Sequence, residues 1–163
     1  MSNANGLSDH VIEEIDKWRA RFPEDQQRSA VIAALHAVQH ENEGFLTAEL
    51  MNGVADYLNL PTIQVYEVAT FYSMFQTRPV GRNNVAICTN VSCMLRGADD
   101  LVDHVEQKLG IKVGESTEDG RIFLKQEEEC IAACCGAPAV MVNHKYHENM
   151  TVEMFDEILD GLE

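Results

Sequence analysis

The chain has 163 residues, of which 45% are hydrophobic and 24% are charged, and its formal net charge at pH 7 is −15. This balance is typical of a folded globular protein, and the length suffices for one ordinary domain or two small ones. The excess of acidic residues repels phosphate backbones and anionic lipids. We therefore expect the chain to bind neither nucleic acid nor a membrane surface directly.

The sequence contains no apolar run near the roughly 20 residues that a membrane-spanning helix needs. Its first ten residues have neither the order of a signal peptide nor the Arg-rich character of a transit peptide. These features predict a cytoplasmic, bacterial protein without direct membrane insertion. The five cysteines agree with a reducing compartment.

The spacing of apolar residues in the first half predicts four short amphipathic helices, over residues 8–22, 27–42, 47–58 and 61–72. Helices of this kind bury their apolar stripes only against one another. Residues 1–77 are therefore expected to form a helical bundle.

Two groups of side chains in these helices are candidates for a function. His36 and His40 lie one helical turn apart, a geometry that can hold a metal. However, no acidic or thiol residue lies at a sequence spacing typical of a third metal ligand. Four aromatic residues repeat at helical spacing, and we interpret them as core packing, with a partner-docking surface as the alternative. They are Tyr66, Phe71, Tyr72 and Phe75.

The pattern changes after the turn-rich residues 78–81, and a second domain is expected over residues 78–163. Strands are predicted at 85–88, 121–126, 139–143 and 146–149, and helices at 98–109 and from Thr151 onward. The order strand, helix, strand, strand, strand, helix predicts a small mixed sheet with helices. The whole chain is therefore expected to be α+β.

All five cysteines lie in this second part, and four of them form two spaced pairs. Four residues separate Cys88 from Cys93, three separate Cys130 from Cys134, and Cys135 follows directly. These spacings are atypical of structural zinc and suit a 2Fe-2S cluster, in which four thiolates surround two irons. A zinc-stabilised module and a disulfide framework are the alternatives. Spacing leaves the fourth ligand open between Cys134 and Cys135, with Cys134 as the simpler choice.

The sequence contains no set of nucleophile, base and orienting acid, and no GxGxxG motif that would bind NADH or flavin. One-electron transfer remains as the chemistry of the cysteine site. A thiol–disulfide enzyme is a further alternative, but the C-x-x-C motif is missing and only the vicinal Cys134 and Cys135 could replace it. The acidic residues Glu127, Glu128 and Glu129 precede Cys130. They are typical of a solvated loop, and our functional hypothesis is that their charge lowers the reduction potential of a cluster.

The paired cysteines, together with VYEVATFYSMF at residues 65–75 and GAPAVMVN at 136–143, resemble the small iron-sulfur subunit of the NADH dehydrogenase module of respiratory complex I. The resemblance covers essentially the whole chain. It implies a helical domain followed by a thioredoxin-like α/β domain that carries one 2Fe-2S cluster. It also implies four cluster ligands, namely Cys88, Cys93, Cys130 and Cys134. A cis peptide bond at Ala137–Pro138 would fit such a fold.

The resemblance further implies a heterodimer with the subunit that binds FMN and NADH, and contact with other iron-sulfur subunits. The chain would then be an enzyme only as a subunit of NADH:quinone oxidoreductase, without a complete catalytic centre of its own. It would lie at the inner face of the bacterial cell membrane through the complex. Related subunits of soluble NAD-dependent formate dehydrogenases and bidirectional hydrogenases are the alternatives.

Overall fold

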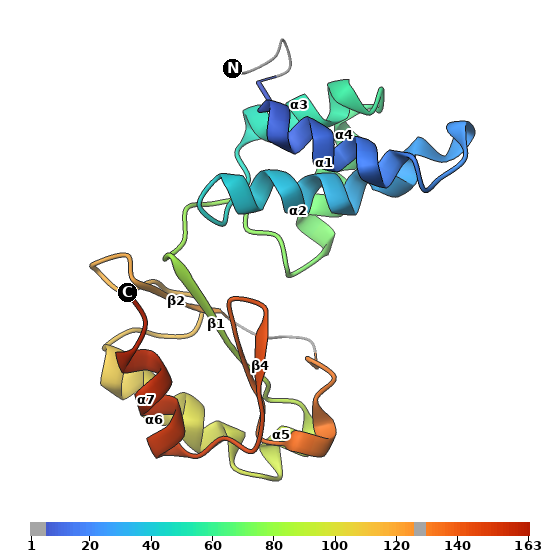
Figure 1. The fold of residues 1–163 in the computed structure, drawn as a ribbon. Coiled ribbons are helices and arrows are strands. Elements are labelled where there is room, and N and C mark those ends of the chain that lie inside the picture. Colours follow the sequence, from blue (N-terminus) through green and yellow to red (C-terminus); the bar gives the residue numbers. More distant parts are fainter. Residues whose placement is uncertain (1–5, 126–129) are drawn as a thin grey trace. The chain divides into compact units, whose positions relative to one another are not determined.

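The computed structural model describes residues 6–125 and 130–163, and the chain divides into two compact units, Met1–Pro79 and Val80–Glu163 (Figure 1). Each unit has buried apolar clusters of its own. None of the helices in the described part of the chain is long and apolar enough to cross a membrane. Helices and a four-stranded mixed sheet confirm the expected α+β class.

The first unit is a bundle of helices in which α1 packs on α2 and α3 packs on α4 (Figure 1). Its core consists of fully buried aliphatic side chains such as Ile15, Leu35, Val54 and Val65. The elements are α1 (Asp9–Arg19), the 3-10 helix η1 (Glu24–Ala30), α2 (Val31–Glu41), α3 (Ala48–Tyr57) and α4 (Thr62–Phe71).

The first two helices differ from the prediction at the turn that joins them. Helix α1 ends at Arg19 rather than at residue 22, and α2 begins only at Val31. The residues between them include η1, in which Gln26 leaves the helical region with φ −116° and ψ 28°. Pro23 lacks a backbone donor, and the chain after it winds in the tighter 3-10 form. The predicted second helix is therefore two elements.

The second unit contains one sheet with the strand order β2-β1-β3-β4, in which β1 runs parallel to β2 and antiparallel to β3. Strands β3 and β4 form an antiparallel hairpin. The strands are β1 (Asn83–Ile87), β2 (Ile122–Lys125), β3 (Val140–Val142) and β4 (Lys145–His147). The helices are α5 (Val91–Met94), α6 (Ala98–Leu109), α7 (Val152–Asp160) and the 3-10 turn η2 (Cys134–Gly136).

Helices α6 and α7 lie together on one face of this sheet (Figure 1). Alternate strand residues pack against them, because side chains alternate between the faces of a strand. The buried contacts join Val85 and Leu124 of the strands to Leu101 of α6 and Phe155 of α7. The predicted range of α6 is confirmed, and it ends at Gly110 with φ 67°.

Two details of the second unit depart from the prediction. No helix was predicted between the strand that ends at Cys88 and the helix at 98–109, but Val91–Met94 form the short helix α5, whose first N–H is capped by the side chain of Asn90. Four residues are too few to show a helical period in the sequence. The hairpin turn comprises Asn143 and His144, both with positive φ, so β4 begins at Lys145 rather than 146.

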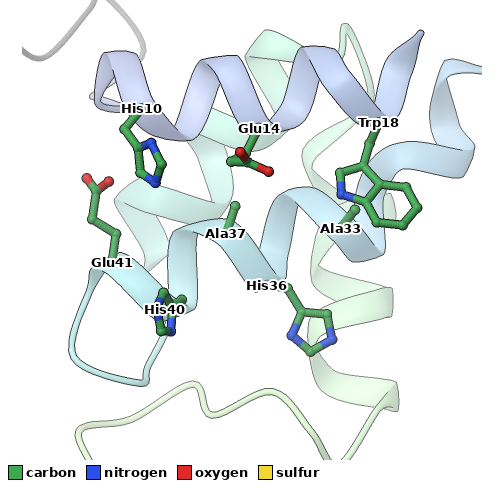
Figure 2. A pocket seen from close by; sticks show the side chains of 8 residues that line it. All are labelled: His10, Glu14, Trp18, Ala33, His36, Ala37, His40 and Glu41. Atoms are coloured by element: carbon green, nitrogen blue, oxygen red, sulfur yellow. The ribbon is translucent and has the colours of Figure 1, made fainter. Parts of the chain in front are cut away.

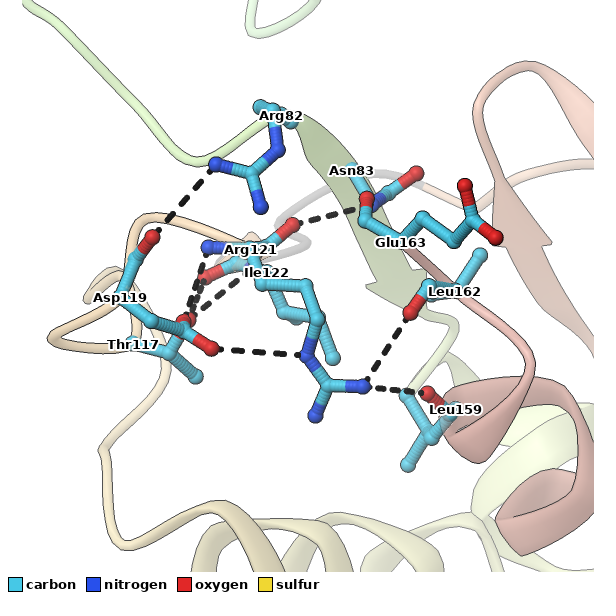
Figure 3. A network of polar contacts seen from close by, with 9 residues as sticks. All are labelled: Arg82, Asn83, Thr117, Asp119, Arg121, Ile122, Leu159, Leu162 and Glu163. Carbon is cyan, nitrogen blue, oxygen red and sulfur yellow. Dashed lines mark hydrogen bonds and ion pairs between the residues drawn. The ribbon is translucent and has the colours of Figure 1, made fainter.

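A polar network holds the C-terminal end of α7 against the sheet (Figure 3). The Arg121 guanidinium donates to the carbonyl oxygens of Leu159 and Leu162, each at 3.2 Å. The Asn83 side chain donates to the carbonyl of Glu163 at 2.8 Å and to that of Arg121 at 3.0 Å. A cation at a helix C-terminus satisfies carbonyls that lack partners within the helix.

Candidate functional site

Cys88 and Cys93 are held by the regular elements of the second unit. Cys88 directly follows β1, and its N–H donates to the carbonyl of Ala139 at 3.1 Å. Cys93 lies in α5, where its N–H donates to the carbonyl of Asn90 at 2.8 Å. Both side chains are buried. The end of the inner strand β1 and the short helix α5 therefore hold the first cysteine pair in a buried place.

Cys130 and Cys134 lie at the surface of the same unit. Their Sγ atoms are 3.6 Å apart, and the N–H of Ala132 donates to the Cys130 sulfur at 3.3 Å. Ala132 reaches this position with φ 61°, a conformation that few residues with a side chain adopt. Two thiolates bound to one tetrahedral metal at about 2.3 Å lie about 3.7 Å apart. This pair can therefore share one metal ion.

Interactions among the thiols also shift their pKa values. Burial raises the pKa of the Cys88 thiol. Hydrogen bonds lower this pKa by more than burial raises it, and they come from the backbone of Ile131 and Asn90 and from the thiols of Cys93 and Cys130. The resulting pKa lies below the ordinary 9.0. Burial and the neighbouring Cys88 thiol raise the pKa of Cys93. The interactions between the pairs join Cys130 of the second pair to the thiols of the first pair.

Cys130 connects the pairs, since its pKa responds to both Cys134 and Cys88. The backbone hydrogen bond of Ala132 lowers this pKa, while the Cys134 thiol and the Cys88 charge raise it to above the ordinary value. Within residues 6–125 and 130–163, Cys135 enters none of these thiol–thiol interactions, although it is exposed. These thiol–thiol interactions therefore involve Cys88, Cys93, Cys130 and Cys134.

This donor set fits a 2Fe-2S cluster, which needs two thiolates for each of two irons. The described residues contain no group of three or more His, Cys, Asp or Glu that could hold a single metal ion. The cysteines instead form two pairs presented by two segments, Cys88–Cys93 and Cys130–Cys134. Glu127, Glu128 and Glu129 lie outside the described residues, so their predicted effect on the potential stays a prediction.

The loop after Cys134 is packed against the segment that follows β4. The N–H of Asn149 donates to the Gly136 carbonyl at 2.6 Å, and that of Met150 donates to the Pro138 carbonyl at 3.0 Å. A Cβ atom at Gly136 would lie 2.5 Å from the Cβ of Glu148. Only glycine fits so close an approach. The peptide bond Ala137–Pro138 is cis.

A groove of about 630 Å³ lies between α1 and α2 of the first unit (Figure 2). Trp18 lines one end and His10 and Glu41 line the other. His36, also in the lining, places its Nε2 at 2.9 Å from the sulfur of Met74. His36 and His40 belong to no group in the described residues that could hold a metal ion. Trp18 is 39% exposed.

The aromatic residues of the first unit are only partly core. Phe75 is buried and Tyr66 and Tyr72 are half-buried, but Phe71 is 77% exposed. Phe71 closes the last turn of α4 and packs edge-on against Tyr72, with ring centroids 5.0 Å apart. The core interpretation is therefore wrong for Phe71, and helical spacing alone could not distinguish it from the others.

Comparison with known proteins indicates a 2Fe-2S site, as the cysteines do. The family model of thioredoxin-like [2Fe-2S] ferredoxins matches residues 15–163. The E subunit of the NADH-quinone oxidoreductase of Rickettsia bellii is 42% identical over 142 residues, which are 87% of this chain and 84% of that protein. The E subunit of Rickettsia conorii is 40% identical, over 94% of this chain and 90% of the relative.

A third relative is the E 2 subunit of the NADH-quinone oxidoreductase of Rhizobium meliloti, 42% identical over 91% of this chain and 86% of its own length. Among solved structures, an NAD+-reducing [NiFe]-hydrogenase in the air-oxidised state matches with a TM-score of 0.66 and 25% identity. That match covers 77% of this chain but only 22% of the hydrogenase chain. The predicted resemblance and fold are thereby confirmed.

Proposed function

This chain belongs to the family of thioredoxin-like [2Fe-2S] ferredoxins, and from that membership we propose that it is the electron-transfer subunit of an NADH:quinone oxidoreductase, respiratory complex I. The observation that carries the proposal is the pair of exposed thiols Cys130 and Cys134, 3.6 Å apart, together with the interaction of Cys130 with the buried Cys88 thiol. In this role the chain contributes to an oxidoreductase as one subunit, and its chemistry is the transfer of single electrons.

The ligands that we assign to the cluster are Cys88 and Cys93 for one iron and Cys130 and Cys134 for the other. The cluster supplies a one-electron couple whose potential depends on charge, hydrogen bonds and solvent access. The buried Cys88 and Cys93 keep water from one side of the site. The exposed Cys130 and Cys134 leave the other side open toward a partner. The backbone donors near Cys88 and Cys130 stabilise thiolate charge.

The partner that we propose is the subunit that binds FMN and NADH, in a heterodimer with this chain, with further iron-sulfur subunits in the same complex. The names of the relatives support this, because each is a subunit of NADH-quinone oxidoreductase. The hydrogenase that is similar in structure is named for its reduction of NAD+. We accordingly place the chain at the inner face of the bacterial cell membrane, held there by the complex.

An equivalent subunit of a soluble NAD-dependent hydrogenase or formate dehydrogenase is the second candidate, and the hydrogenase structure favours it. The relatives named as NADH-quinone oxidoreductase subunits are 40% and 42% identical to this chain, against 25% for the hydrogenase. The first candidate therefore has the stronger support.

Coupling between the cluster and the NADH/NAD+ ratio tests this function. The full chain is purified together with its flavin-binding partner, and the reduced cluster is followed by electron paramagnetic resonance. In the heterodimer the fraction reduced should follow the NADH/NAD+ ratio, whereas this chain alone should not respond. A loaded cluster that ignores the ratio within an intact, flavin-containing heterodimer would contradict the proposal.

A further inference from the structure

Ala132 has a backbone conformation that its own side chain does not favour. Its φ is 61°, in the left-handed region that residues with a Cβ rarely adopt. The other described residues that have a side chain and a positive φ are polar, and short polar side chains such as that of Asn stabilise this region through local hydrogen bonds. They are Glu43, Asn59, Asn143, His144 and Asn149. Alanine offers no such hydrogen bond, so its conformation depends on the interactions of its backbone.

The backbone of Ala132 interacts with the cysteine site. Its side chain is exposed, whereas its N–H donates to the Cys130 sulfur at 3.3 Å. The preceding residue, Ile131, is 8% exposed and belongs to the apolar cluster that contains Cys88 and Cys93. The buried Ile131 therefore anchors the loop, and Ala132 contributes through its backbone rather than through side-chain packing.

The residues around Ala132 have the backbone geometry of an anion-binding turn. Ala133 follows with φ −101° and ψ 39°, so the sign of φ reverses between adjacent residues. Turns of this kind direct successive N–H groups to one side, and the concave backbone that results binds phosphates and iron–sulfur clusters. A backbone hydrogen bond of Ile131 also reaches the thiol of Cys88. Two consecutive residues therefore interact with one thiol of each cysteine pair.

We propose that the N–H of Ala132, directed at the Cys130 sulfur by the positive φ, raises the reduction potential of the cluster. The inference rests on the proposed function, because it requires a cluster bound to Cys130. On reduction, one electron from the donor converts one ferric iron to ferrous iron, and no bond forms or breaks. The sulfur ligands then carry more negative charge, and an N–H donor stabilises that state more than the oxidised one. Loss of this donor therefore lowers the potential.

Redox titration of the purified full-length protein with dithionite as the reductant, followed by electron paramagnetic resonance, tests the proposal. Ala132→Pro removes the N–H and fixes φ near about −65°. It should lower the ratio of reduced to oxidised cluster at fixed potential about threefold, which is about 28 mV at 59 mV per tenfold change. If the proline variant holds no cluster, Ala132→Val replaces it, because a β-branched side chain disfavours a positive φ and turns the N–H away from the sulfur.

Ala132→Gly is the conservative variant and should retain the wild-type potential, since glycine adopts a positive φ freely and keeps the N–H. His144→Val is the control for backbone strain, because His144 also has a positive φ, of 66°. It follows β3 at the end of the sheet away from Cys88, so the potential should stay unchanged. An unshifted potential in the loaded Ala132→Pro or Ala132→Val variant, or an equal fall in Ala132→Gly, would overturn the inference. Absence of a cluster from the wild type would instead contradict the proposed function.

Discussion

At the scale of single residues, the structure distinguishes the adjacent thiols of Cys134 and Cys135, which the cysteine spacing in the sequence could not distinguish. Cys134 interacts with Cys130 at 3.6 Å, whereas Cys135 enters no thiol–thiol interaction among the described residues. Spacing predicted both cysteine pairs and the position of Cys88 at a strand end. It could not choose between neighbours in the chain, because the backbone of the 3-10 turn decides which side chain faces Cys130.

Serine substitutions test this assignment of ligands. Changing Cys88, Cys93, Cys130 or Cys134 to serine should reduce bound iron from about two per chain to well below one, because each thiolate holds one iron. Cys135→Ser should retain the full iron content and the wild-type spectrum. Iron and sulfide assays on anaerobically purified variants give the measurement. Loss of the cluster from Cys135→Ser, with retention in Cys134→Ser, would reverse the assignment.

Gly136 is the residue of the site loop where a side chain has least room. Gly136→Ala would place a Cβ 2.5 Å from the Cβ of Glu148, and overpacking of this kind costs about 1–3 kcal/mol. We expect a lower free energy of unfolding in urea and faster loss of iron. The control is Gly161→Ala, whose Cβ would meet no atom nearer than 3.4 Å. Equal stability of both variants would show that the loop can move away.

At the scale of elements, capping residues predicted boundaries better than apolar periodicity did. Thr151 accepts from the N–H of Met154 and starts α7 where the sequence placed it, and Thr47 does the same for α3. Periodicity failed for α5 and η1 because each is too short, or too tightly wound, to repeat a 3.6-residue pattern.

Helices α6 and α7 are joined by an ionic contact with a defined pH dependence. Asp156 accepts from His104 at 2.8 Å and pairs with Lys108 at 3.1 Å. The hydrogen bond with His104 and the contacts with Lys108 lower the pKa of Asp156 below its ordinary 3.8. A carboxyl group whose pKa is lower in the folded state stabilises the fold above its unfolded pKa, and this stabilisation is lost as the pH falls through the folded pKa.

Asp156→Asn should therefore lower the free energy of unfolding near neutral pH, and this effect should shrink as the pH falls below 3.8 and through the lowered pKa of Asp156. Urea unfolding of wild type and variant at several pH values measures the difference. Glu157→Gln, an exposed change on the same helix, is the control and should leave the pH profile close to that of the wild type. A stability difference that stayed constant from neutral to acidic pH would exclude the ionic contact as its cause.

At the scale of the whole molecule, the change from helical to strand-like patterning predicted two domains, at residues 1–77 and 78–163. The contacts of the structure group Met1–Pro79 and Val80–Glu163. The order of the strands could not be predicted, because the pairing of β1 between β2 and β3 joins residues far apart in the sequence. Local patterns contain no information on which strand becomes central.

If the two units are separate domains, a protease should cut between them first. Thr77, Arg78 and Pro79 are exposed, and exposed connecting segments are the preferred sites of proteolytic cleavage. Brief digestion with a broad-specificity protease should give two fragments that meet near residues 77–81, identified by mass spectrometry. First cuts inside α2 or the sheet, before any between the units, would argue against two domains.

The central claim is that the cysteine pairs hold a 2Fe-2S cluster that carries single electrons. Electron paramagnetic resonance of the anaerobically purified full chain after dithionite reduction tests it most directly, with iron, sulfide and zinc assayed on the same sample. We predict a rhombic signal of about one spin per chain, with about two irons and two sulfides. A colourless sample without a signal and with stoichiometric zinc would contradict the claim and make the site structural.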